Sequence, residues 1–210
     1  LFAMHVCFAQ KNMYGTLTYN KAVNISGKQR MLTQKMGKTY LYLLNNPDDF
    51  KAKRDLKIAK ILFEKQLSIL EENSKSKKVK KELKIVKDTW IKYKSFLEKE
   101  PNKSDAIKII NTNSTILKYA NNVVNAIIIE SRQGNSINSF QVQEDSELKQ
   151  VINKSGRQRM LSQRLALYYF ANKPDLKTTG TLNKLQIVFK ELDEALSFLL
   201  ISNFNDERVD

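Results

Sequence analysis

The chain has 210 residues, 28% of them charged and 41% hydrophobic, with only 6 Gly and 3 Pro. This composition excludes a disordered chain and a β-sandwich, and it favours long helices. The length suits one domain, or one domain with a partial repeat, and is too short for two large domains. The formal net charge of +14 means that an anionic partner must be considered.

The first nine residues, LFAMHVCFA, are apolar and end in a small residue. They are similar to the end of a secretory signal peptide, which predicts cleavage between Ala9 and Gln10 and an exported, soluble protein in the periplasm. A short buried N-terminal segment is the alternative. After Ala9 no apolar run approaches the ~20 residues that span a bilayer.

Cleavage after Ala9 would also remove His5 and Cys7, the only His and the only Cys. The remaining chain would have no imidazole or thiol for nucleophilic catalysis, general-base chemistry or metal binding. We therefore expect no catalytic residue, no metal site and no cofactor, and we predict that the protein is not an enzyme.

Lysine is concentrated from Lys51 to Lys99, above all in KSKKVKKELK at residues 75–84. Such a run can bind nucleic acid or an anionic membrane, or it can be the solvated face of two helices. The run lacks the interleaved aromatic side chains that stack on bases. The second interpretation is favoured, and no nucleic-acid partner is predicted.

Four long helices are predicted over residues 14–45, 49–73, 76–99 and from Ser104 onward. Pro47 and Pro101 lie in two of the breaks between them, and Ser104 is the expected N-cap of the fourth helix, with Asp105 in its first turn. Apolar residues recur at alternating spacings of three and four, which is the spacing of a bundle seam. Four such helices with short connections predict an all-α fold, a long antiparallel four-helix bundle.

The predicted inward positions follow from this spacing. They are Leu56, Ala59, Phe63, Leu67 and Leu70 in the second helix, Val79, Leu83, Val86, Trp90, Tyr93 and Leu97 in the third, and Ala106, Ile110, Asn113, Leu117, Ala120, Val124 and Ile127 in the fourth.

After Arg132 the polar stretch QGNSINSFQVQ, residues 133–143, either bends the chain or lets one helix run through. A fifth helix over about residues 144–172 and a sixth with the seam Leu182, Leu185, Phe189, Leu192, Leu196 and Leu199 are predicted to follow. These two helices repeat the first two, without copies of the third and fourth. The predicted organisation is a signal-peptide remnant over residues 1–9, a bundle over 10–140 and a partial repeat over 141–210.

The repeat is clearest between NISGKQRMLTQKMGKTYLYL at residues 24–43 and NKSGRQRMLSQRLALYYF at residues 153–170. On a helix, Ile25, Leu32, Met36 and Leu43 form one line, the bundle core. A second line lies ~140° away around the helix. In the first copy it consists of Val23, Gly27, Arg30, Gln34, Gly37 and Leu41, and in the second of Ile152, Gly156, Arg159, Gln163, Ala166 and Phe170.

Each second line is apolar at its ends, has a small residue one step inward and has Arg beside Gln at its centre. If two such lines pair, from two chains or from the two copies in one chain, their arginines face each other. A bound anion would cancel the repulsion and accept bidentate hydrogen bonds. The candidate ligand-binding residues are therefore Gly27, Arg30, Gln34, Gly156, Arg159 and Gln163. The alternative is that both arginines lie on solvated helix faces.

The segments SGKQRMLTQKM and SGRQRMLSQRL resemble the signature of the PilJ-type domain, the N-terminal domain of type IV pili methyl-accepting chemotaxis transducers. They are also similar to the P-box of the nitrate and nitrite sensor kinases. The resemblance implies a periplasmic four-helix sensor bundle that holds nitrate, nitrite or a similar small anion between P-box helices. It places the arginine that holds the anion at Arg30 and Arg159, and the glycine beside the ligand at Gly27 and Gly156.

Sensors of this family are normally flanked by transmembrane helices and followed by a signalling module, and the sequence shows neither feature. We therefore expect a free-standing module that binds a small oxyanion and docks on a membrane chemoreceptor or sensor kinase, as a homodimer or with its two P-box helices paired within one chain. In the better-matched second copy, Arg159 is expected to matter at least as much as Arg30. The alternative is a structural or interaction protein that keeps the bundle, binds no small ligand and pairs with a receptor or a pilus component.

Overall fold

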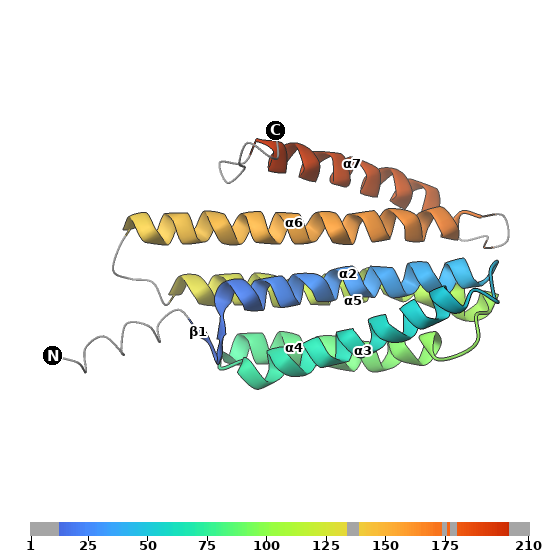
Figure 1. Cartoon of the computed structure of the whole chain (residues 1–210), viewed down its shortest axis with the longest axis horizontal. Coiled ribbons are helices and arrows are strands. Elements are labelled where there is room, and N and C mark those ends of the chain that lie inside the picture. The colour runs from blue at the N-terminus through green and yellow to red at the C-terminus, as the bar shows by residue number, and fades with distance from the viewer. Residues whose placement is uncertain (1–12, 134–138, 174–175, 177–179, 202–210) are drawn as a thin grey trace.

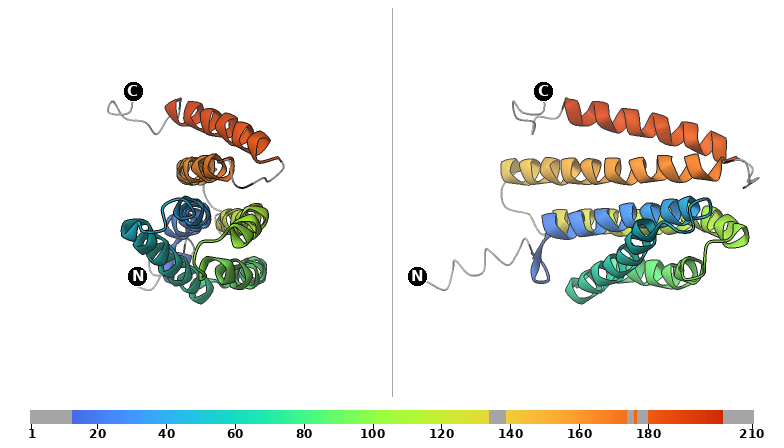
Figure 2. Two further views of the ribbon diagram at one scale, coloured as in Figure 1. Left: turned by 90° about the vertical axis from the view of Figure 1, so that its right-hand side faces the viewer. Right: turned by 45° about the vertical axis from the view of Figure 1, so that its right-hand side comes forward.

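The computed structural model describes residues 13–133, 139–173, 176 and 180–201. In this part of the chain the helices are α2 (Tyr19–Leu43), α3 (Phe50–Asn73), α4 (Lys77–Leu97), α5 (Lys103–Gln133), α6 (Ser139–Ala171) and α7 (Thr181–Leu200). The predicted all-α fold is confirmed: α2 to α5 form a four-helix bundle, α6 packs along α2, and α7 packs on the outer side of α6 (Figures 1 and 2). None of the helices in the described ranges is long and apolar enough to cross a bilayer.

The segment before α2 differs from the prediction, which began the first helix at residue 14. Residues 13–18 instead form a small hairpin of β1 (Met13–Tyr14) and β2 (Leu17–Thr18). Gly15 has a φ of 63°, a left-handed conformation that glycine adopts without strain. The hairpin is fixed to the end of α3, because Tyr14 Oη donates to the Leu70 carbonyl at 2.8 Å and Thr16 N donates to Asn73 Oδ1 at 2.7 Å.

Each helix of the bundle begins at a side chain that accepts a backbone N–H. The caps are Thr18, Asp49, Ser76 and Asn102. The predicted cap of the fourth helix, Ser104, is wrong by two residues, because Asn102 Oδ1 accepts from Asp105 N at 2.9 Å and α5 already includes Ser104. The expectation that Asp105 lies in the first turn is confirmed.

The buried residues of α3 and α4 are those that the sequence predicts. Every predicted inward position of α5 is buried as well, but α5 buries a second stripe that includes Ile109, Ile116 and Val123. The reason is its central place: α5 packs against both α2 and α4 and also contacts α6. A single apolar stripe is enough for a helix that packs on one side only, whereas α5 packs on several helices and needs a wider apolar surface.

The predicted seam of the sixth helix is not buried as expected. Leu182, Phe189 and Leu196 are 57%, 64% and 46% exposed, whereas Val188 and Ala195 are buried against α6. A helix that packs on one neighbour buries one stripe, and α7 packs only on α6 among the described helices. A second apolar stripe therefore remains on the outside of the molecule.

Gly37 allows three helices to approach α2. A Cβ atom at this position would lie 2.7 Å from Leu167 Cδ1 of α6, 2.8 Å from Tyr93 Oη of α4 and 3.3 Å from Asn113 Nδ2 of α5. These neighbours are themselves connected, because Asn113 Nδ2 donates to Tyr93 Oη at 3.1 Å. Any side chain at residue 37 would have to displace them.

We expect Gly37→Ala to lower the free energy of unfolding by about 1 to 3 kcal/mol, because an added methyl group overpacks a filled core. Gly27→Ala is the matched control, since its Cβ would meet only Arg30 Nη2, at an ordinary 3.5 Å. It should be neutral or stabilising by up to about 1 kcal/mol, the helix propensity gained. Urea unfolding followed by circular dichroism measures both, and equal stability of the two variants would contradict the packing described.

Candidate functional site

The two copies of the repeated motif lie side by side, on α2 and α6. The helices run in the same direction and pack along each other (Figure 1). Near one end, a Cβ on Gly156 would be only 3.9 Å from Gly27 Cα. Near the other end, the rings of Tyr42 and Phe170 pack edge to face with centroids 5.6 Å apart. Gly27, Gly156 and Phe170 of the two second lines thus lie at a helix-helix contact within one chain.

Arg30 is buried at this contact, with 2% of its surface exposed. Its Nη1 donates to Asn121 Oδ1 of α5 at 2.8 Å, and its Nη2 donates to Asn153 Oδ1 and to the Asn153 carbonyl of α6 at 2.7 and 3.2 Å. All these acceptors are neutral, and no carboxylate forms an ion pair with Arg30 among the described residues. Its Nε is buried and has no acceptor in the described part of the chain. A buried cation without a counter-ion is costly, which makes this group a candidate for anion binding.

Arg159, the counterpart of Arg30, makes the reciprocal contact: its Nη2 donates to Asn24 Oδ1 of α2 at 3.3 Å. Asn24 and Asn153 occupy equivalent positions, so each motif binds the first residue of the other. Unlike Arg30, however, Arg159 is exposed. Arg30 is enclosed by Asn121 of α5, and the second repeat has no counterpart of α5 in the described chain.

Both guanidinium groups converge on Gly156. A Cβ at Gly156 would lie 3.5 Å from Arg30 Nη2 and 3.7 Å from Arg159 Nη2. Burial, with the positive charges of Arg157 and Arg159 nearby, lowers the pKa of Arg30 to about 10. At neutral pH Arg30 is still charged in both the folded and the unfolded chain, so the fold carries the cost of burying the cation.

A pocket of about 240 Å³ opens beside Arg30 between α5 and α6. It is lined by Arg30, Ser114, Leu117, Lys118, Asn121, Arg157, Met160, Arg164 and Glu191. Four cations therefore face one carboxylate, and that carboxylate pairs with Arg157 at 3.1 Å. Arg164 is fixed by Ser114 Oγ and Tyr168 Oη at 3.3 and 3.4 Å. The pocket is positively charged and has polar donors on both sides.

Several of these residues were missed by the sequence prediction, although a signal was present. Arg157 and Arg164 are the positions at which the second copy has Arg and the first has Lys28 and Lys35. Lys35 lies instead on the α3 side, 3.7 Å from Asp55. Asn121 could not be found from the motif, because it comes from α5.

The contacts of Gln34 and Gln163, the two glutamines predicted to bind the ligand, do not show such a role. Gln34 is fully buried and its Nε2 donates to Thr33 Oγ1 at 3.0 Å, whereas Gln163 is half-buried. The Oε1 atom of each has no partner in the described residues. No hydrogen bond joins either glutamine to Arg30 or Arg159 within the described ranges, and their role as ligands stays a prediction.

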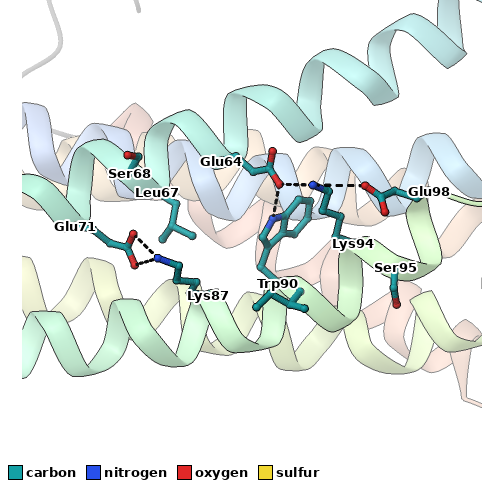
Figure 3. Close-up of a pocket in the computed structure, with 10 residues that line it drawn as sticks. Glu64, Leu67, Ser68, Glu71, Lys87, Trp90, Lys94, Ser95 and Glu98 are labelled. Carbon is teal, nitrogen blue, oxygen red and sulfur yellow. Dashed lines mark hydrogen bonds and ion pairs between the residues drawn. The ribbon is translucent and has the colours of Figure 1, made fainter.

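A second groove, of about 580 Å³, lies between α3 and α4 (Figure 3). Its charged groups pair with one another: Lys94 Nζ lies 2.7 Å from Glu64 Oε1, which also accepts from Trp90 Nε1 at 3.1 Å, and Lys87 binds Glu71 at 3.1 Å. These pairs join two helices that otherwise make few contacts. With its charges satisfied, the groove is a weaker candidate for ligand binding than the pocket at Arg30.

The fold and the site define a helical-bundle module in which two copies of one arginine motif meet. The sequence matches the family described as "Type IV pili methyl-accepting chemotaxis transducer N-term" (PilJ) over residues 17–124 and 140–203. The chain therefore belongs to this family of sensor and signalling modules, and the resemblance carried by its two motifs is confirmed. No curated protein and no solved structure matches the chain. The two matched stretches follow the repeat, while the boundaries 1–9, 10–140 and 141–210 stay predictions, the first lying outside the described residues.

We expect Asn153→Ala to lower the free energy of unfolding by about 1 to 3 kcal/mol, because it removes an acceptor from a buried charged donor. Asn24→Ala is the matched control: it changes the equivalent residue of the other repeat, whose arginine is exposed, and should cost less than about 0.5 kcal/mol. Both variants make the same change in a helix, so propensity cancels in the comparison. Equal losses in urea unfolding would mean that the burial of Arg30 contributes nothing at this contact.

Proposed function

We propose that this chain is a periplasmic sensor module that binds a small oxyanion, such as nitrate or nitrite, at the contact between α2 and α6. The observation that carries the proposal is the Arg30 guanidinium, which is buried without a carboxylate partner in the described residues. It lines a pocket together with three other cationic side chains. An anion there would supply the missing counter-charge and an acceptor for Nε.

The pocket suits a small, flat anion better than a large ligand. A volume of about 240 Å³ holds a few water-sized groups, and the donors that surround it come from α2, α5 and α6. A planar oxyanion matches the fork of N–H groups on a guanidinium, which a lysine ammonium cannot reproduce. Arg157 and Arg164 would contact the anion from the other wall, and Lys118 would add to the positive potential.

The proposal also concerns the place of the protein in a signalling system. Domains of this family typically lie in the periplasmic part of membrane chemoreceptors. We propose that the module acts in the periplasm and reports the anion to a membrane chemoreceptor or sensor kinase. A structural protein that pairs with a receptor or pilus component without a small ligand is the competing function, and it would leave the charge of Arg30 uncompensated.

The test is calorimetry of the purified chain with nitrate and nitrite, with chloride as a control for ionic strength. We expect Arg30→Lys to weaken binding by roughly tenfold to a few hundredfold, because hydrogen bonds to a charged group contribute about 1.5 to 3 kcal/mol each. Arg54→Ala, an exposed arginine on α3, is the control and should bind as the parent does. Absence of binding to any small oxyanion by the parent would overturn this function and favour the structural one.

A second variant tests the asymmetry of the two repeats. Because Arg159 is exposed and Arg30 is buried, we expect Arg159→Ala to weaken anion binding less than Arg30→Lys does, although the motif of Arg159 is the better match. The same calorimetric titration measures it. A larger loss from Arg159→Ala would place the anion over Gly156 on the α6 side and outside the pocket of Arg30.

A further inference from the structure

The outer side of α3 combines exposed apolar side chains with cations. Eight residues are exposed between Phe50 and Lys65, and each of them is either large and apolar or basic. The apolar four, Phe50, Ile58, Ile61 and Leu62, are 81%, 43%, 53% and 41% exposed. The basic four are Lys51, Arg54, Lys57 and Lys65. We call these eight residues the α3 face.

The carboxylates of this stretch do not neutralise the α3 face. Asp55 and Glu64 lie at its two sides, where they pair with lysines of α2 and α4 at 3.7 and 2.7 Å. The exposed residues Asp48 and Glu72 lie beyond the two ends of the stretch. The α3 face is therefore basic and apolar, with no acidic or uncharged polar residue among its members.

Helix α4 provides a contrast within the same lysine-rich region. Its exposed residues are mostly lysines, with Asp88 and Ser95 among them, and only one of them, Ile91, is large and apolar. This is the pattern of a solvated helix face, which the sequence favours for the whole region. The α3 face does not fit that interpretation, because several large apolar side chains gathered on one exposed surface mark an interaction site.

The shape of the α3 face suits a flat partner. At 1.5 Å and ~100° per residue, its eight side chains extend about 22 Å along the helix within an arc of about 140°, with apolar and basic side chains interleaved. In the described part of the chain α3 packs mainly on α2, and its outer side points away from the other helices (Figure 2). A flat surface could therefore contact the whole α3 face at once.

We propose that the α3 face binds the surface of an anionic phospholipid bilayer. Such a surface is flat, and it offers anionic head groups to the four cations and an apolar layer just beneath them to the four apolar side chains. Long Lys and Arg side chains reach the head groups while their apolar neighbours lie deeper. Nucleic acid matches the cations alone, because the aliphatic side chains have no counterpart on a phosphate backbone and Phe50 is the one aromatic ring available for stacking.

The contact is peripheral, made by one face of one helix, and it does not use the anion site. The net charge of +14 would draw the chain toward any anionic membrane, and the α3 face would decide which side of the molecule meets it. Attachment of this kind would hold the module at the membrane in which its proposed receptor lies.

The experiment is co-sedimentation of the full chain with vesicles of phosphatidylcholine, with or without added phosphatidylglycerol. We expect binding only when phosphatidylglycerol is present, and weaker binding as salt is added, because salt screens the charges. We expect Ile61→Asp to weaken binding by about tenfold or more, since it removes an apolar contact and places a carboxylate among anionic head groups. Ile91→Asp is the matched control: it makes the same change on α4, at a side chain that is 64% exposed, and should bind as the parent does.

A second matched pair tests the cations. We expect Lys57→Glu to weaken vesicle binding by about tenfold or more, because it reverses a charge that faces the head groups. Lys84→Glu makes the same change at an exposed lysine of α4 and should stay within about threefold of the parent, the effect of net charge alone. Circular dichroism should show the same helicity for all four variants, since all four side chains are exposed.

Absence of binding to vesicles that contain phosphatidylglycerol would overturn the proposal, as would equal binding to vesicles without it. Equal affinities within either matched pair would also overturn it, because the α3 face would then contribute no more than α4 does. The vesicle assay contains no nitrate, so this proposal and the anion site at Arg30 can fail independently.

Discussion

The burial of the Arg30 guanidinium between α2, α5 and α6 is the constraint on which the rest of the structure depends. A cation can be removed from water only if its donors are occupied, and three neutral acceptors on two other helices occupy Nη1 and Nη2. These acceptors fix where α5 and α6 must lie along α2. Gly27 and Gly156 lie at the same contact, where a Cβ on either residue would be 3.5 Å from Arg30 Nη2.

The two copies of the motif have different surroundings on α2 and α6. On α2, both of its apolar lines are covered, one by the rest of the bundle and the other by α6. On α6, Gly156 of the corresponding line meets α2, but Ala166 and Phe170 of the same line border a groove between α6 and α7. The near-symmetry of the α2–α6 pair is therefore local: Asn24 and Asn153 make reciprocal contacts, yet the surroundings of the two arginines differ completely.

Electrostatics and packing act in opposite directions at this contact. Burial and the neighbouring cations lower the pKa of Arg30, which means that the folded chain disfavours its charged form. Close packing at Gly37, where Leu167, Tyr93 and Asn113 converge, holds α2 against its neighbours a short distance further along the helix. The contact between α2 and α6 therefore has a closely packed apolar end and an end at which a cation is buried at a cost.

The sequence by itself determined the helices, the buried faces of α3 and α4, the repeat and the arginine motif, because each is a local pattern of spacing and chemistry. It did not determine the hairpin at residues 13–18 or the Asn102 cap, where backbone conformation and a single hydrogen bond decide. Only the tertiary structure decided that Arg30 is buried while Arg159 is exposed, and that Phe63 is covered while Phe189 is not. The physical reason is the same in both cases: periodicity shows that a helix has a face to bury, but the burial of that face depends on which other helix packs against it.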